Sequence, residues 1–124
     1  MTIRNVDVLL KPRSVALIGA SARPGRVGLI TAQSLLSGGF PGPIWFVNPK
    51  HDAIDSHPCH SSIAELPSAP DLAIIVTPPQ TVPQLISDLG AKGTRAAVVI
   101  TAGIRGDLKQ AMLDASRPYT LRIQ

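Results

Sequence analysis

Residues 14–28 read SVALIGASARPGRVG, and this stretch decides how the rest of the chain is interpreted. Val15 to Ile18 form an apolar run that is too short for a helix and rich in branched residues, as in a buried strand. Gly19 ends the run, and helical periodicity begins after Gly28. A strand, a glycine-bearing loop and a helix together present backbone N–H groups and a positive helix end to a phosphate.

Length and composition predict a single domain. The 124 residues leave room for one hydrophobic core, and no apolar run approaches the ~20 residues of a membrane span. Residues 1–5 lack the apolar centre of a secretion signal, and the single Cys59 predicts a cytoplasmic location. Because aromatic residues make up only 3% of the chain, few side chains are available to stack on the bases of a nucleic acid. We therefore expect neither nucleic acid nor a membrane as a partner.

The positive charge is unevenly distributed along the sequence. Residues 1–50 carry six Lys or Arg and one acid, whereas the other 74 residues carry six Lys or Arg and seven acids. We therefore expect the excess charge around the glycine loop and the strand that follows it. Local charge there favours a small anionic ligand over nucleic acid, and a solvated basic face is the alternative.

Hydrophobic periodicity and turn residues predict alternating strands and helices. Strands are expected at 14–19, 44–47, 71–76, 96–100 and 119–123, and helices at 27–37, 80–91 and 107–116. The connecting segments are an amphipathic turn at 5–10, a loop with a short strand at 52–60, a capping box at 62–65, and glycine caps at Gly38–Gly39 and at Gly90 or Gly93. The alternation predicts an α/β fold: one domain with a Rossmann-like, doubly wound parallel sheet.

Ligands of such sheets bind at the carboxyl ends of the strands, near the switch point. Small, polar or basic residues follow four of the predicted strands, in the glycine loop and at 48–51, 77–79 and 101–103. This coincidence predicts the binding site.

The glycine loop departs from the nicotinamide fingerprint G-x-G-x-x-G, because Ser21 stands where the second glycine belongs. The glycines are instead Gly19, Gly25 and Gly28. Strand 44–47 is followed by Asn48-Pro49-Lys50, with no acid to hold a free ribose diol before Asp52. A lysine there gains a charge-assisted contact from a ribose phosphate. The site therefore favours a phosphorylated adenosine, either coenzyme A or NADP.

Residues capable of other chemistry are interpreted as structural. His51, His57, His60 and Cys59 do not have a recognised zinc spacing, and we expect loop histidines and an inert thiol. No base in the sequence is placed to activate a serine nucleophile. We therefore predict no catalytic residue and no metal site.

Five motifs resemble one family in order and spacing. They are LLKPRSVALIGASARPGRVG, SGGFPGPI, VNPKH, PDLAIIVTPP and VVITAGI. Together they resemble the N-terminal coenzyme-A-binding domain of the NDP-forming acyl-CoA synthetases, which also occurs fused to GNAT acetyltransferases. The resemblance covers essentially the whole chain and implies a Rossmann-like domain akin to that of the succinyl-CoA synthetase α subunit.

This resemblance implies a role for each strand end. The Gly19–Gly28 loop would hold the CoA phosphates, Lys50 would face the 3′-phosphate, and segments 76–79 and 100–103 would line the adenine and pantetheine path. The implied binding residues are Gly19, Ala20, Ser21, Arg23, Pro24, Gly25, Val27, Gly28, Asn48, Pro49, Lys50, Val76, Thr77, Pro78, Pro79, Ile100, Thr101, Ala102 and Gly103.

The family continues into a domain with a phosphorylated histidine and an ATP-grasp portion, neither of which follows here. Residues 1–124 are therefore expected to be an excised CoA-binding fragment of a ligase or acetyltransferase. We expect it to bind CoA or acyl-CoA without catalysis, to need the missing C-terminal domains for chemistry, and to form a homodimer at high concentration. Two alternatives stay open: an NADP-binding domain of an oxidoreductase and a nonbinding Rossmann-like scaffold.

Overall fold

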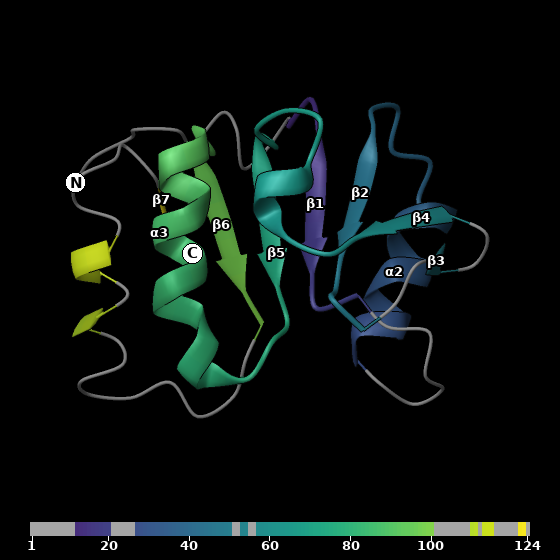
Figure 1. The fold of residues 1–124 in the computed structure, drawn as a ribbon. Helices are drawn as coiled ribbons and strands as arrows, with labels where there is room; N and C mark the ends of the chain where they lie inside the picture. Colours follow the sequence, from purple (N-terminus) through teal and green to yellow (C-terminus); the bar gives the residue numbers. More distant parts are fainter. Residues whose placement is uncertain are drawn as a thin grey trace.

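The computed structural model describes residues 12–20, 27–50, 53–54, 57–100, 110–111, 113–115 and 122–123 (Figure 1). The strands are β1 Val15–Ile18, β2 Ile44–Val47, β3 Ala53–Ile54, β4 His57–His60, β5 Leu72–Ile75, β6 Ala96–Val99 and β7 Arg122–Ile123. The α-helices are α2 Val27–Ser37 and α3 Val82–Lys92, and the 3-10 turns are η1 Ile63–Glu65 and η2 Pro79–Thr81.

The described strands form one sheet in the order β3-β4-β2-β1-β5-β6-β7. Neighbouring strands are parallel except for the antiparallel pair β3 and β4. From β1 the chain adds β2 and β4 on one side and then β5, β6 and β7 on the other. This reversal beside β1 confirms the predicted doubly wound, Rossmann-like α/β fold and defines its switch point.

Strand β1 lies inside the sheet, and all four of its side chains are buried. Because side chains alternate along a strand, Leu17 packs with Phe46 and Ala32 of α2, whereas Ile18 packs on the opposite face. That face is covered by α3 and η1. A continuous apolar run is what a parallel strand buried on both faces requires.

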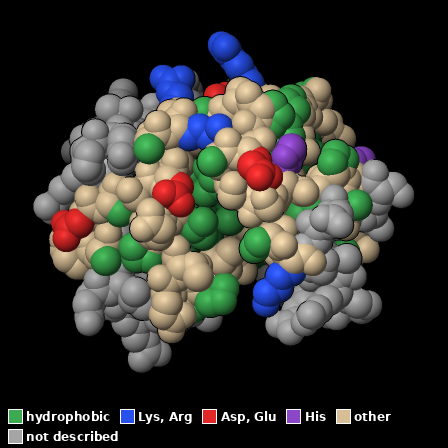
Figure 2. Space-filling model, in the orientation of Figure 1, with side chains coloured by type: hydrophobic (Ala, Val, Ile, Leu, Met, Phe, Trp, Pro, Cys, Tyr) green, Lys and Arg blue, Asp and Glu red, His purple; other side chains and the backbone are tan. Residues whose placement is uncertain are grey.

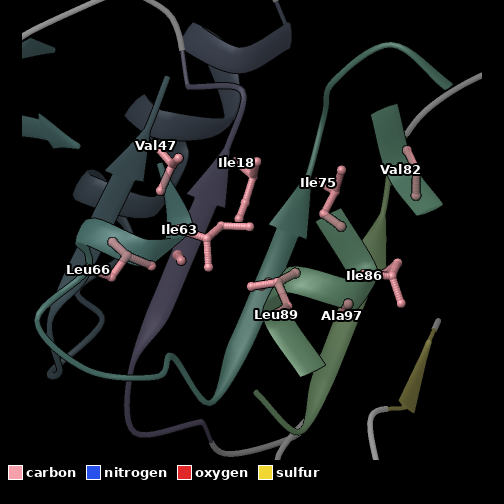
Figure 3. Close-up of a cluster of buried hydrophobic side chains, with 11 residues drawn as sticks. Ile18, Val47, Ile63, Leu66, Ile75, Val82, Ile86, Leu89 and Ala97 are labelled. Atoms are coloured by element: carbon pink, nitrogen blue, oxygen red, sulfur yellow. The ribbon is translucent and has the colours of Figure 1, made fainter. Parts of the chain in front are cut away.

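The larger core cluster lies between the sheet and α3 with η1. In Figure 3, Ile18 and Ile75 extend from neighbouring strands toward the layer that holds Ile63, Ile86 and Leu89. Fully burying one such side chain stabilises the folded state by about 1.5–3 kcal/mol. This cluster therefore fixes α3 against the strands whose carboxyl ends form the candidate site.

Most predicted boundaries agree with the structure. The helix at 27–37 and the strand at 44–47 are confirmed as predicted, and the strands at 14–19, 71–76 and 96–100 are shorter by one residue at one or both ends. The helix predicted at 80–91 is a 3-10 turn followed by α3. Pro83 lies in the first turn of α3, where its missing N–H costs no hydrogen bond.

The structure corrects or refines three local predictions. Residues 57–60 form strand β4, which confirms the short strand expected within 52–60 and places His57 and His60 in a strand and not in a loop. Ser62 makes no side-chain capping bond, since the Glu65 N–H donates to the Ser62 carbonyl oxygen at 3.2 Å, and Glu65 Oε2 accepts from the Ser61 hydroxyl at 2.6 Å. Of the glycines offered as caps, the left-handed ones are Gly39 and Gly93, whereas Gly90 lies inside α3.

Part of the predicted pattern lies outside the described residues. This holds for the turn at 5–10 and for most of the predicted helix at 107–116 and strand at 119–123. Residues 110–111 and 113–115 are helical, and β7 occupies 122–123, in agreement with these two predictions. Among the described residues, no helix is long and apolar enough to cross a membrane.

Candidate functional site

The carboxyl ends of the central parallel strands meet at one edge of the sheet, the lower edge in Figure 1. The residue after each strand donates its N–H to the last carbonyl of the neighbouring strand, which keeps the strand ends level. The three bonds are Gly19 N to Val47 O at 2.9 Å, Val76 N to Ile18 O at 2.9 Å, and Ile100 N to Ile75 O at 2.8 Å. The sheet thus brings together the residues that immediately follow four strands, Gly19, Asn48, Val76 and Ile100.

Gly19 begins the glycine loop in a conformation that favours glycine, with φ at +98°. A Cβ at this position would lie 3.0 Å from Val76 Cγ2 and 3.1 Å from Thr77 Cγ2. The backbone of the loop therefore passes directly against the segment that follows β5. A side chain at Gly19 would separate the two segments.

Asn48 joins the segment after β2 to the glycine loop. Its side-chain Nδ2 donates to the Ala20 carbonyl at 2.8 Å, and its Oδ1 accepts from the Lys50 N–H at 2.9 Å. The second bond closes an Asx turn over Pro49. Lys50 is exposed, so its ammonium group is free to meet a ligand from solvent.

Two residues that the sequence did not predict also lie at this edge. The His60 carbonyl at the end of β4 accepts from Asn48 N at 2.9 Å, which places β4 beside the Lys50 segment. Thr81 Oγ1 lies 2.7 Å from both Thr77 Oγ1 and the Pro78 carbonyl oxygen. A threonine just before the periodic residues of α3 is the signal that could have marked Thr81.

The predicted concentration of positive charge is only partly correct. Arg13 precedes β1, and its backbone N–H donates to Asp71 Oδ2 at 2.9 Å, so it lies at the amino edge of the sheet, opposite the site. Lys92 and Arg95, at the end of α3 and just before β6, lie at that same edge. Figure 2 shows most of the described Lys and Arg side chains along its upper border, which is this amino edge. Among the described Lys and Arg side chains, Lys50 alone follows a strand at the carboxyl edge.

The predicted site residues therefore fall into two groups. Those placed along the carboxyl edge are Gly19, Ala20, Asn48, Pro49, Lys50, Val76, Thr77, Pro78, Pro79 and Ile100. Ser21, Arg23, Pro24, Gly25, Thr101, Ala102, Gly103 and His51 lie outside the described residues, and only the backbone is described for Val27 and Gly28. Within the described part of the chain, no group of three or more His, Cys, Asp or Glu side chains is arranged to hold a metal ion.

A family model described as a CoA binding domain matches residues 13–124, which is nearly the whole chain. The chain belongs to this CoA-binding domain family. Its sequence is 34% identical over 130 residues to the α subunit of acetate–CoA ligase (ADP-forming) I from Pyrococcus furiosus, covering 96% of this chain and 28% of that protein. It is 37% identical over 116 residues to acetate–CoA ligase (ADP-forming) from Methanocaldococcus jannaschii, covering 90% and 16% respectively.

A solved structure supports the same relationship. The dinucleotide-forming acetyl-coenzyme A synthetase 1 from Ca. Korarchaeum cryptofilum superposes with a TM-score of 0.90 at 30% identity, covering 95% of this chain and 27% of that one. This CoA-binding domain thus corresponds to the CoA-binding module of ADP-forming acyl-CoA synthetases. The family match favours CoA over the NADP alternative, and none of these three relatives is named as an acetyltransferase.

Proposed function

We propose that the domain binds CoA along the carboxyl edge of its sheet. In this arrangement the loop from Gly19 to Gly28 holds the diphosphate, and Lys50 binds the 3′-phosphate. Segments 76–79 and 100–103 line the path of the adenine and the pantetheine. The observation that carries the proposal is the bond from Asn48 to Ala20, because it holds the segment of the exposed Lys50 beside the glycine loop.

The proposal depends on two different phosphate contacts. Backbone N–H groups and the positive end of a helix suit a diphosphate that approaches closely. An ammonium group on a flexible side chain suits a terminal phosphate as a point charge. CoA carries both a diphosphate and a terminal 3′-phosphate, so a single CoA molecule would use both the glycine loop and the lysine at this sheet edge.

We also propose that residues 1–124 form one domain of a longer ADP-forming acyl-CoA ligase, whose other domains contact this one and perform the chemistry. The ligase names of the relatives, and the small share of their length that the chain covers, support this proposal. Alone, the chain should show no turnover with acetate, ATP and CoA. Turnover that Lys50→Ala abolishes would contradict the assignment of the chemistry to other domains.

A homodimer and a cytoplasmic location stay predictions. Light scattering over a concentration series tests the homodimer, and a constant monomer mass up to the highest concentration would contradict it. The location prediction depends on the single cysteine of the chain, as expected in a reducing compartment.

The deciding experiment for CoA is a calorimetric titration with CoA, dephospho-CoA, NADP and NAD. We expect CoA to bind most tightly, dephospho-CoA more weakly because it lacks the 3′-phosphate, and NAD to give no heat. Tighter binding of NADP than of CoA would contradict the proposed function.

A further inference from the structure

The Asn48 side chain uses both of its polar atoms within the protein. Nδ2 donates to the carbonyl oxygen of Ala20, a fully buried residue, and Oδ1 accepts from the Lys50 backbone N–H. These two bonds use one of the two N–H donors of the amide and one of the two lone pairs of its oxygen, and together they fix the orientation of the amide within the protein. The family resemblance implies that Asn48 is a binding residue, and these bonds direct both polar atoms of its side chain toward the protein backbone.

The backbone of Asn48 is held as firmly as its side chain. Its N–H donates to the His60 carbonyl at 2.9 Å, and the Cys59 thiol lies 3.7 Å from the Asn48 carbonyl oxygen. On the other side, Gly19 N–H donates to the Val47 carbonyl at 2.9 Å. The residue is therefore anchored on β4 and extends its amide across to the loop after β1.

These contacts connect two segments that hold different parts of one ligand in the proposed function. The Ala20 bond sets the separation between the glycine loop and the segment after β2, and the Asx turn sets the direction in which the chain leaves toward Lys50. A ligand that bridges the two segments gains affinity when their separation is fixed before binding, because less ordering remains to be done in the complex.

We propose that Asn48 is a positioning residue: it holds Lys50 at the distance from the glycine loop that matches the spacing between the 3′-phosphate and the diphosphate of CoA. This inference rests on the proposed function. It assigns to Asn48 a role that requires both Lys50 and the 3′-phosphate, and no contact with CoA. The effect of removing Asn48 must therefore vanish when either of those two groups is absent.

The test is a double-mutant cycle of Asn48→Ala and Lys50→Ala, with CoA and dephospho-CoA titrated against each variant. We expect Asn48→Ala to weaken CoA binding about 5- to 10-fold, as for the loss of one or two hydrogen bonds, and to change dephospho-CoA binding less than about 2-fold. In the Lys50→Ala background, Asn48→Ala should cause no further loss of CoA affinity.

Two further variants sharpen the result. Asn48→Ser keeps an oxygen that can accept from the Lys50 N–H but cannot reach Ala20, so it should bind CoA as weakly as Asn48→Ala. Gln84→Ala is the control, because it removes an exposed amide that donates to Asp88 along α3, away from the Asn48 segment. It should leave both affinities unchanged.

The ratio of the two affinities within one variant does not depend on how much of the protein is folded, so partial unfolding does not obscure the outcome. Equal weakening of CoA and dephospho-CoA by Asn48→Ala, an additive cycle, or full affinity in Asn48→Ser would overturn the inference while leaving the proposed function intact. If Lys50→Ala itself weakens both ligands equally, the assignment of Lys50 is wrong and the inference about Asn48 is wrong with it.

Discussion

Gly19 and Val76 approach each other so closely that a side chain on Gly19 would contact Val76 Cγ2 at 3.0 Å. Strands β1 and β5 are parallel neighbours, and Val76 N–H donates to the Ile18 carbonyl immediately before Gly19. The contact lies at the switch point, where ligands of doubly wound sheets bind. The absence of a side chain at Gly19 therefore allows the segments after β1 and β5 to pack directly against each other.

Gly19→Ala should destabilise the domain by about 2–4 kcal/mol, because it combines a strained backbone with a steric clash. Gly39→Ala is the matched control. Gly39 also has a positive φ, +75°, but no atom lies within 4 Å of an added Cβ. Gly39→Ala should lower the free energy of unfolding by about 1–2 kcal/mol, from the backbone strain alone. Urea denaturation measures both, and equal losses would show that the approach to Val76 carries no cost.

Lys50→Ala should weaken CoA binding roughly 10- to 100-fold and leave dephospho-CoA binding nearly unchanged. The range corresponds to about 1.5–3 kcal/mol for a hydrogen bond with a charged partner. Lys92→Ala serves as the control, since Lys92 lies at the end of α3, near the amino edge of the sheet. Calorimetric titration measures the affinities, and a similar loss for the Lys92 variant would indicate a general effect of charge.

Ile86→Ala should lower the free energy of unfolding by about 2–5 kcal/mol, as expected for a cavity in a packed core. Ile86 is fully buried between α3 and the sheet, whereas Ile30 on α2 keeps 55% of its surface exposed. Ile30→Ala should therefore change stability by less than about 0.5 kcal/mol. Denaturant titration of the two variants distinguishes a core position from a surface position on a helix of equal length.

The Ser61 hydroxyl and backbone N–H both donate to Glu65 and hold the pKa of its carboxyl below its ordinary value, with a smaller contribution from His60. Because the folded pKa is depressed, the stabilisation is present above the unfolded pKa and is lost as the pH falls through the folded pKa. Ser61→Ala should raise the pKa of Glu65, whereas Ser62→Ala should leave it unchanged. Carboxyl carbon shifts in an NMR titration measure both, and an unchanged pKa in the Ser61 variant would contradict the contact.

The tertiary structure corrected predictions made from the sequence where an interaction joins distant segments, or where two neighbouring residues could contact the same partner. The proximity of Arg13 to the glycine loop in sequence predicted a shared charge patch, yet β1 separates them and places Arg13 at the opposite edge. The sequence predicted a capping box from Ser62 to Glu65, and only the path of the chain entering η1 placed the Ser61 hydroxyl against the Glu65 carboxylate instead.

The sequence by itself determined most element types, the fold class and the family. The spacing of apolar residues and the positions of glycine and proline are local signals, because they determine the backbone conformation of the residues next to them. The sequence also determined that polar and glycine residues follow the strands at their carboxyl ends. Only the tertiary structure decided that Asn48 bonds Ala20 and that Gly19 lies against Val76. These pairs are 28 and 57 positions apart (48 − 20 and 76 − 19). They meet because parallel pairing on both sides of β1 brings the ends of three strands to one edge, and no local pattern encodes that register.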